Sequence, residues 1–169
     1  MLKKFNGERG SKIPPLFSMT LFVGLDIAEK MGVVYNRLNS GIYYCTTYKG
    51  TPIEQFEMLR DVLGDELENV VVFYEELNTF VNANTTRSLL HRAGYLKNSF
   101  LKFGVKKVEP VNALAARKFL GFKDKKSVGE YFSKWKLNQD EADAMAILLF
   151  AKAEPLELLG EESVKCLRL

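Results

Sequence analysis

The chain has 169 residues, of which 47% are hydrophobic and 27% charged, and its formal net charge is +3. These values are typical of one globular domain, and the sequence has no run of eighteen apolar residues that would predict a membrane span. Two cysteines and a single histidine exclude a disulfide framework and a Cys/His metal cluster. The low cysteine count also favours a reducing compartment, the cytoplasm.

The net charge is unevenly distributed along the chain. Residues 1–18 carry four basic residues and one acidic residue, and they predict a flexible basic tail ahead of a domain over residues 19–153. Residues 87–136 carry 13 basic residues and only three acidic ones. Such a stretch favours a polyanionic partner such as nucleic acid. The alternative is a set of solvated helix faces paired with the acidic segments, and charge alone leaves both open.

The first half of the chain alternates between strand and helix patterns. Apolar, aromatic and β-branched residues, separated by turn residues, predict an antiparallel meander of three strands over residues 21–27, 31–35 and 42–48. Thr51 and Pro52 predict the start of a helix that runs to about Leu67. The strongly apolar residues 70–75 predict a buried strand.

The second half predicts mainly helices. Helical spacing of apolar residues covers residues 84–103, and residues 107–111 form a strand that Pro110 places at a sheet edge. Three more helices are expected, one capped by Asn112, one opened by a capping box at Ser127 and one capped by Asp140. Residues 154–169 are expected to form a tail. This order predicts an α/β domain with a mixed sheet and helices on its faces.

Four acidic residues are the candidates for chemistry. Asp26 lies inside an apolar strand, where an unpaired carboxylate is costly, so a cation is expected nearby. Glu75 ends a second apolar strand, and Asp140 and Asp143 lie one helical turn apart. Oxygen ligands of this kind suit Mg²⁺ or Mn²⁺, and two such ions could activate water for phosphodiester cleavage. Taken separately, Asp140 and Asp143 are also explained by helix capping, and Glu75 by an ordinary strand end.

Three motifs give these acids a family context. They are Phe22-Val-Gly-Leu-Asp-Ile-Ala28, Val72-Phe-Tyr-Glu-Glu-Leu77 and Gln139-Asp-Glu-Ala-Asp-Ala-Met-Ala-Ile147. Over residues 21–152 the chain resembles the RuvC family of Holliday junction resolvases, within the RNase H-like nuclease superfamily, and its length resembles a bacteriophage version. The resemblance implies an RNase H-like α/β fold: a five-stranded mixed sheet in the order 3-2-1-4-5 with helices on both faces.

The resemblance also implies an activity and a site. The chain would be a crossover junction endodeoxyribonuclease that acts as a homodimer on four-way and other branched DNA, with two Mg²⁺ ions per active site and Mn²⁺ as a substitute. Asp26 would bridge both ions, Glu75 and Asp143 would each hold one, and Asp140 would assist; Glu76 is a lesser candidate for the role of Glu75. The dimer interface would involve helix 84–103. No nucleotide cofactor and no membrane partner are expected, and a phage-encoded chain would act in the cytoplasm of its bacterial host.

The DNA contacts implied by the resemblance are basic and aromatic. Lys126 matches a family lysine near the scissile phosphate, and its neighbours Lys123 and Lys125 suit contacts with the DNA backbone. Arg117 and Lys118 lie near a second basic position. Where the family often has a base-stacking aromatic residue this chain has Asn78, and Phe80 is the candidate substitute.

Two other functions stay open from the sequence. The same fold could serve a YqgF-type RNA nuclease, or a non-catalytic module that binds branched DNA. The intact set of four acids argues against the second alternative.

Overall fold

The structure, a computed structural model, describes residues 19–65, 67–77 and 82–168. The expected tail over residues 1–18 lies outside these residues. The strands are β1 (Leu21–Asp26), β2 (Lys30–Arg37), β3 (Tyr43–Lys49), β4 (Val70–Glu75), β5 (Lys107–Val111) and β6 (Val164–Cys166). The α-helices are α1 (Pro52–Leu63), α2 (Ala83–Lys102), α3 (Ala113–Leu120), α4 (Lys125–Phe132) and α5 (Gln139–Ala151).

The strands form one mixed sheet in the order β5-β4-β1-β2-β3-β6. Strands β1, β2 and β3 are antiparallel neighbours, which confirms the predicted meander, while β4 pairs in parallel with both β1 and β5. The predicted order 3-2-1-4-5 is present, but the predicted number of five strands is wrong. The sixth strand, β6, adds to the free edge of β3 in parallel.

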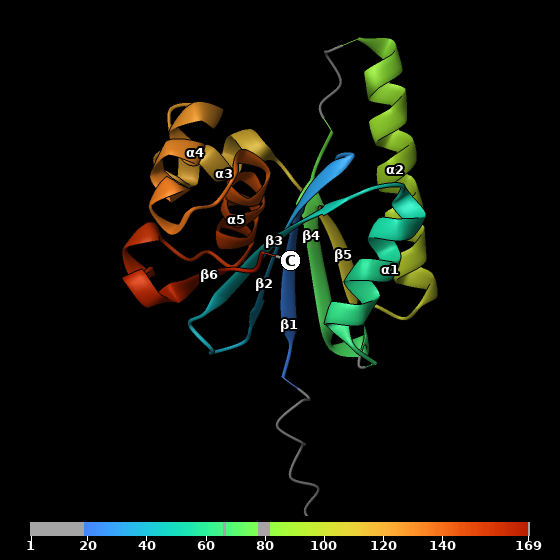
Figure 1. Ribbon diagram of the computed structural model, residues 1–169, viewed down its shortest axis with the longest axis horizontal. Helices are drawn as coiled ribbons and strands as arrows, with labels where there is room; N and C mark the ends of the chain where they lie inside the picture. Colours follow the sequence, from blue (N-terminus) through green and yellow to red (C-terminus); the bar gives the residue numbers. More distant parts are fainter. Residues whose placement is uncertain (1–18, 66, 78–81, 169) are drawn as a thin grey trace, which may run out of the picture.

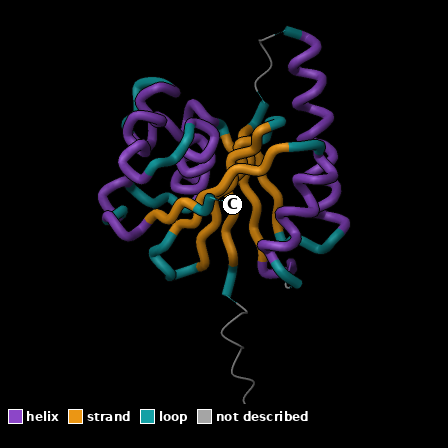
Figure 2. Tube along the Cα trace, viewed as in Figure 1, coloured by secondary structure: helices purple, strands orange, loops and turns teal. Residues whose placement is uncertain are grey.

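Helices cover both faces of the sheet (Figures 1 and 2). On one face α1 and α2 pack on the inner side chains of β1, β2 and β4 and close one hydrophobic core. On the other face α3, α4 and α5 close a second core. Side chains of a strand alternate between the two faces, so each strand contributes to both cores.

Helix α5 lies between the sheet and the other two helices of its layer. Its residues from Glu141 to Leu149 are all buried. A helix that is buried all round is expected to lack a polar face, and the run Ala142 to Phe150 is almost wholly apolar. The position of α5 therefore depends on packing along its whole length.

Two predicted helix starts are wrong by a few residues. Helix α4 is capped by Asp124, whose carboxylate accepts from Ser127 N at 2.8 Å, so Ser127 is the third residue of the helix instead of its cap. Helix α5 is capped by Asn138, which leaves Asp140 in the first turn. In both cases the sequence offers several capping side chains in a row, and spacing alone does not choose among them. The helix α4 also ends at Phe132, and a 3-10 turn, η2, follows at Ser133–Trp135.

Residues 154–168 differ from the expected tail. They form two 3-10 turns, Leu156–Leu158 and Glu161–Ser163, before strand β6. Val164 is buried in the core, and Trp135 Nε1 donates to Glu161 O at 3.1 Å. The three-residue strand was too short to stand out in the sequence. In the part of the chain that the structure describes, no helix is long and apolar enough to span a membrane.

Candidate functional site

Two of the four candidate acids end neighbouring strands. Asp26 is the last residue of β1 and Glu75 is the last residue of β4. Because these strands run in parallel, both carboxylates lie at the carboxyl-terminal end of the strands, on the same side of the domain. Strand alternation directs both toward α5, since Gly24 and Phe73, two residues earlier in each strand, also meet the α5 side. Asp26 is only 6% exposed.

The other two acids reach this end of the strands because α5 approaches the sheet very closely. A Cβ atom added to Gly32 of β2 would lie 2.0 Å from Asp140 O, and one added to Gly24 of β1 would lie 2.6 Å from Ala144 O. Glycine is the residue that permits such backbone contact. The first turn of α5 therefore sits on β1 and β2, with Asp140 and Asp143 beside Asp26.

The side chain of Lys125 provides the positive charge of the cluster. Its Nζ lies 2.9 Å from Asp143 Oδ2, and the negative charges of Asp143, Asp26 and Glu75 all act on it. Burial alone would lower the pKa of Lys125, but its pairing with Asp143 and the other two acids raises it. Asp143 Oδ2 is buried, and its contact with Lys125 is an ion pair. Gln139 Nε2 completes the arrangement by donating to Asp143 Oδ1 at 3.1 Å and to Lys125 O at 3.0 Å.

The clustering of acids shifts their protonation. Burial raises the pKa of Asp26 to about 8; the charge of Lys125 lowers it, and the charges of Glu75, Asp143 and Asp140 raise it further. Burial also raises the pKa of Asp143, against the opposing effects of Lys125, Gln139 and Arg117. The cluster therefore carries more carboxylate than one lysine neutralises, and the raised pKa of Asp26 favours its protonated form in the absence of a metal ion.

This protonation predicts how stability depends on pH. Between its ordinary value of 3.8 and about 8, Asp26 binds a proton in the folded state that it releases on unfolding. The resulting contribution to stability is complete below 3.8 and is lost as the pH rises through about 8. In EDTA we expect the free energy of unfolding, from urea titrations at pH 6 to 8.5, to fall by roughly 1 kcal/mol per pH unit. Asp26→Asn should flatten this slope, and equal slopes in the two proteins would contradict the assignment.

The residues present fit a divalent cation, although their side chains are not preorganised as a complete coordination site. Across residues 19–65, 67–77 and 82–168, no three acidic, His or Cys side chains converge closely enough to hold a metal as they stand. A cavity of about 20 Å³ lies between Glu75, Lys125, Asp143 and Arg117, which is room for one water molecule or ion. The all-carboxylate donor set is suited to Mg²⁺ or Mn²⁺, and a bound cation would offset the mutual repulsion of the acids that raises the pKa of Asp26.

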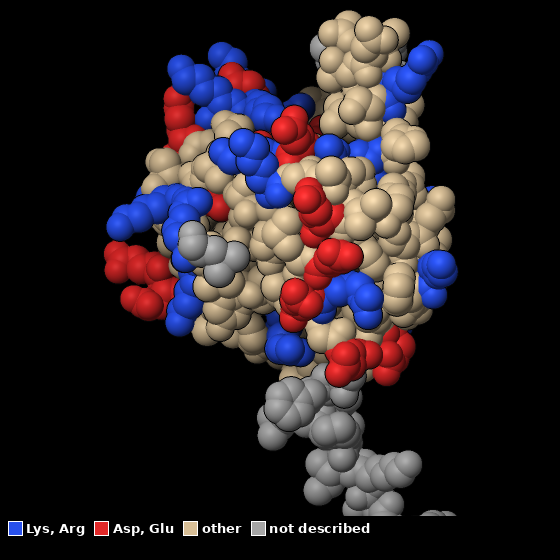
Figure 3. Space-filling model, turned by 45° about the vertical axis from the view of Figure 1, so that its right-hand side comes forward, with Lys and Arg blue, Asp and Glu red and all other residues tan. Residues whose placement is uncertain are grey.

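The remaining predicted site residues occupy different places. Arg117 lines the cavity and acts on Asp143, whereas Lys126 is 85% exposed in its side chain and pairs with Glu130 at 3.7 Å. Lys118 and Lys123 are exposed on the same layer. In Figure 3, Lys and Arg side chains gather over the lobe formed by α3 and α4, next to a hollow beside the free end of α2. Phe80 lies outside the described residues.

Glu75 and Glu76 point in different directions. Glu75 lines the small cavity beside Asp143 on the α5 face. Glu76 is exposed and lines a shallow pocket with Leu90 and Lys97 of α2, on the other face. The geometry thus favours Glu75 as the partner of Asp26.

Sequence reasoning missed three residues at this site. Gln139 was quoted in a motif without a role, Lys30 lies 3.9 Å from Asp140 Oδ2, and Glu141 is fully buried in the first turn of α5. Only Glu141 had a usable signal, because an acid at the third helical position after Asn138 forms a capping box. Lys30 comes from β2, and its proximity depends on the fold.

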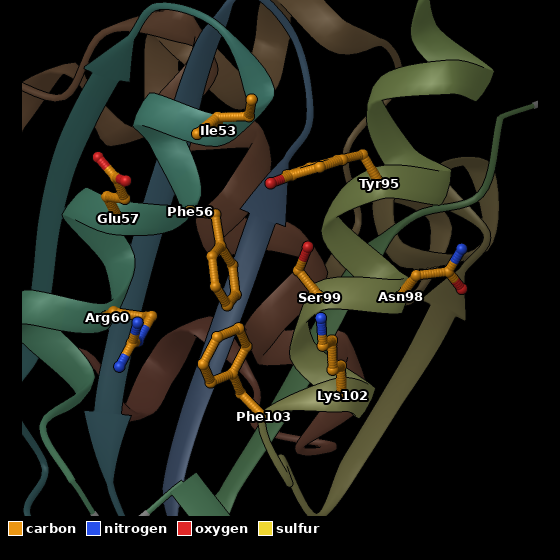
Figure 4. A pocket seen from close by; sticks show the side chains of 9 residues that line it. All are labelled: Ile53, Phe56, Glu57, Arg60, Tyr95, Asn98, Ser99, Lys102 and Phe103. Carbon is orange, nitrogen blue, oxygen red and sulfur yellow. The ribbon is translucent and has the colours of Figure 1, made fainter.

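A larger groove than the cavity at the acidic cluster lies elsewhere. It has a volume of about 390 Å³ between α1 and α2, on the sheet face opposite α5, and its lining includes Phe56, Tyr95 and Phe103 (Figure 4). The Arg60 guanidinium stacks over the Phe103 ring at 4.3 Å from its centre. This groove contains a single acid, Glu57, and has no link to the acidic cluster.

The strand order and the two helical layers form an RNase H-like α/β fold. The solved structures that share it include two of RuvC from Thermus thermophilus, one of them in complex with a Holliday junction substrate. Each matches with a TM-score of 0.57 and 17% identity, over 79% of this chain and 96% of the RuvC chain. No protein-family model matches the sequence, and a search of curated proteins finds no match. The comparisons therefore establish a RuvC-like fold.

Proposed function

We propose that this protein is a structure-specific endodeoxyribonuclease that resolves Holliday junctions and other branched DNAs by paired metal-dependent nicks. The observation that carries the proposal is the convergence of Asp26, Glu75, Asp140 and Asp143 at one end of the strands of a RuvC-like sheet. The lobe of α3 and α4, with its exposed lysines, supports DNA backbone contacts beside this cluster.

The four acids would hold two Mg²⁺ ions, with Asp26 shared between them. When bound, the ions would supply an activated water and stabilise the leaving oxygen. The protein's own part is to orient the acids through β1, β4 and α5 and to exclude bulk water from Asp26. Asp26 would release its proton to solvent when metal binds, and the Lys125 ammonium would exchange Asp143 for a phosphate oxygen of the DNA.

The deciding experiment is cleavage of a synthetic four-way junction with and without Mg²⁺, with both strands labelled. Symmetric nicks on opposing strands only in the presence of Mg²⁺ support the proposal. Preferred cleavage of structured RNA in a parallel reaction would indicate a YqgF-type RNA nuclease instead. Junction binding without Mn²⁺ binding or cleavage would indicate a non-catalytic module.

Lys125 provides a sharper test of the site. In Lys125→Met the chain keeps the apolar stem but loses the ammonium beside Asp143, so kcat for junction cleavage should fall roughly 100-fold. Lys107→Met is the matched control, because Lys107 pairs with Glu109 at 2.8 Å on the edge strand β5, away from the cluster. A Lys125→Met protein with the wild-type kcat would exclude a role for this ammonium in the reaction.

A homodimer is part of the proposal because a junction has two strands to cut. Helix α2 exposes Leu90, Tyr95 and Leu101, which are 36–50% exposed, and it also borders the groove of Figure 4. Large exposed apolar side chains on one helix favour a protein contact. Sedimentation of the purified protein, with Leu101→Glu as the comparison, tests whether α2 forms the interface.

A further inference from the structure

The carboxylate of Glu141 is buried one residue away from Asp140. Its side chain is 0% exposed, and it accepts hydrogen bonds from Thr47 Oγ1 of β3 at 2.9 Å and from the Asn138 backbone N–H at 3.0 Å. Asn138 Nδ2 in turn donates to the same Thr47 oxygen at 2.9 Å. These contacts join the first turn of α5 to β3. They are neutral, however, and a buried carboxylate is destabilising unless a cation is also present.

The cation comes from the end of the described chain. Arg168 Nη1 lies 3.1 Å from Glu141 Oε1, and Arg168 also donates to Lys136 O, just before α5. Cys166 Sγ lies 3.7 Å from Glu141 Oε2. We call residues 164–168 the C-terminal arm. It is held on the edge of the sheet by the parallel pairing of β6 with β3 and by Leu167 N, which donates to Cys45 O at 2.7 Å.

The C-terminal arm and the acidic cluster therefore meet at the same helical turn. Glu141 faces β3 and the arm, while Asp140 and Asp143, on either side of it in sequence, lie beside Asp26. A movement of this turn shifts all three acids together, because they share one rigid backbone. Gly32 packing, the Asn138 cap and the contacts of Gln139 and Asp143 with Lys125 hold the same turn from its other sides.

We propose that Arg168 is a positioning residue for the reaction: by neutralising Glu141 it fixes the first turn of α5, and so places Asp140 and Asp143 for metal binding. The proposal rests on the proposed function for its metal and cleavage readouts. Arg168 itself pairs with Glu141 and Lys136 O, on the side of the turn away from Asp140 and Asp143.

The test compares Arg168→Met with wild-type protein at 15 °C, where both are folded. Amide hydrogen exchange at residues 141–143 should be at least tenfold faster in the variant, with unchanged exchange in β1 and β4. Mn²⁺ affinity by calorimetry should fall about tenfold, and kcat for the junction should fall while KM stays the same. The melting temperature should fall by on the order of 5 °C.

Three further proteins complete the test. Arg168→Lys keeps a positive charge and should recover most of the lost Mn²⁺ affinity. The double variant Glu141→Gln/Arg168→Met removes the buried charge together with its partner, so it should recover stability and slow exchange. Lys165→Met, an exposed change in the same C-terminal arm, should match the wild type.

The outcomes separate the two proposals. If the wild-type protein neither binds Mn²⁺ nor cleaves, the proposed function fails, but the exchange data still decide the role of Arg168. Exchange at residues 141–143 that is unchanged in Arg168→Met would overturn the positioning role. A lower melting temperature with wild-type Mn²⁺ affinity would mean that Arg168 only stabilises the fold. That outcome would also overturn the positioning role.

Discussion

Asp26→Asn should abolish junction cleavage, with a loss of at least about 10³-fold in kcat, while junction affinity stays equal or improves. Asparagine keeps the size of the side chain but cannot supply the shared negative ligand that we propose for two cations. Asparagine also cannot take up the negative charge that Asp26 would carry with metal bound, so DNA phosphates should meet less carboxylate repulsion at the site. Strand-labelled cleavage and gel-shift titrations in Mg²⁺ measure the two effects.

The same variant should be more stable than the wild type in metal-free buffer. Because Asp26 is buried with a raised pKa, its ionisation opposes folding at alkaline pH, and asparagine does not ionise. At pH 8.5 in EDTA we expect a melting temperature higher by a few degrees. Retained cutting by Asp26→Asn in Mg²⁺ would refute the proposed metal site, whatever its stability.

Gly32→Ala should be among the most destabilising single methyl additions in the described chain. The new Cβ would lie 2.0 Å from Asp140 O and 2.2 Å from the Asp140 carbonyl carbon, both of them backbone atoms that cannot move aside alone. Overpacking of this kind costs on the order of 3 kcal/mol. The clash pushes the first turn of α5 away from β2, so Mn²⁺ affinity should fall together with the free energy of unfolding, measured by urea titration.

Gly94→Ala is the matched control for this prediction. Gly94 lies inside α2, has no atom within 4 Å of an added Cβ, and has no left-handed backbone angle. Alanine there should stabilise the protein by up to about 1 kcal/mol through helix propensity. If Gly32→Ala were as stable as Gly94→Ala, then α5 would not approach β2 as closely as the structure shows.

Most of the sheet was predictable because strong local patterns mark it. The meander, β4 and the edge strand β5 all follow from apolar or β-branched runs, and Pro110 correctly indicated the edge. Strand β6 was missed because three residues carry no period, and its pairing with β3 is a contact between distant parts of the chain. The starts of α4 and α5 were misplaced because the choice among neighbouring caps depends on geometry in three dimensions.

In the candidate site too, local sequence patterns predicted some residues, and contacts in three dimensions decided the others. The unusual positions of Asp26 and Glu75 within apolar strands were visible in the sequence, and the structure brings both together with Asp140 and Asp143. The sequence ranked Lys126 above Lys125, but the structure places Lys125 beside Asp143. One residue along a helix rotates the side chain by about 100°, so only the exact start of α4 decides which lysine faces the acids.

The two edges of the sheet limit how a second copy could join this protein. Strand β5 presents Pro110 and Lys107 at one edge, and β6 offers only three residues at the other. Proline cannot donate to a neighbouring strand, and a very short strand gives little to pair with. A continuous sheet across two subunits is therefore disfavoured at both ends, as is uncontrolled strand-to-strand aggregation. Self-association would then use the helical layers, where a helix-to-helix contact would hold two copies of the acidic cluster at a fixed separation.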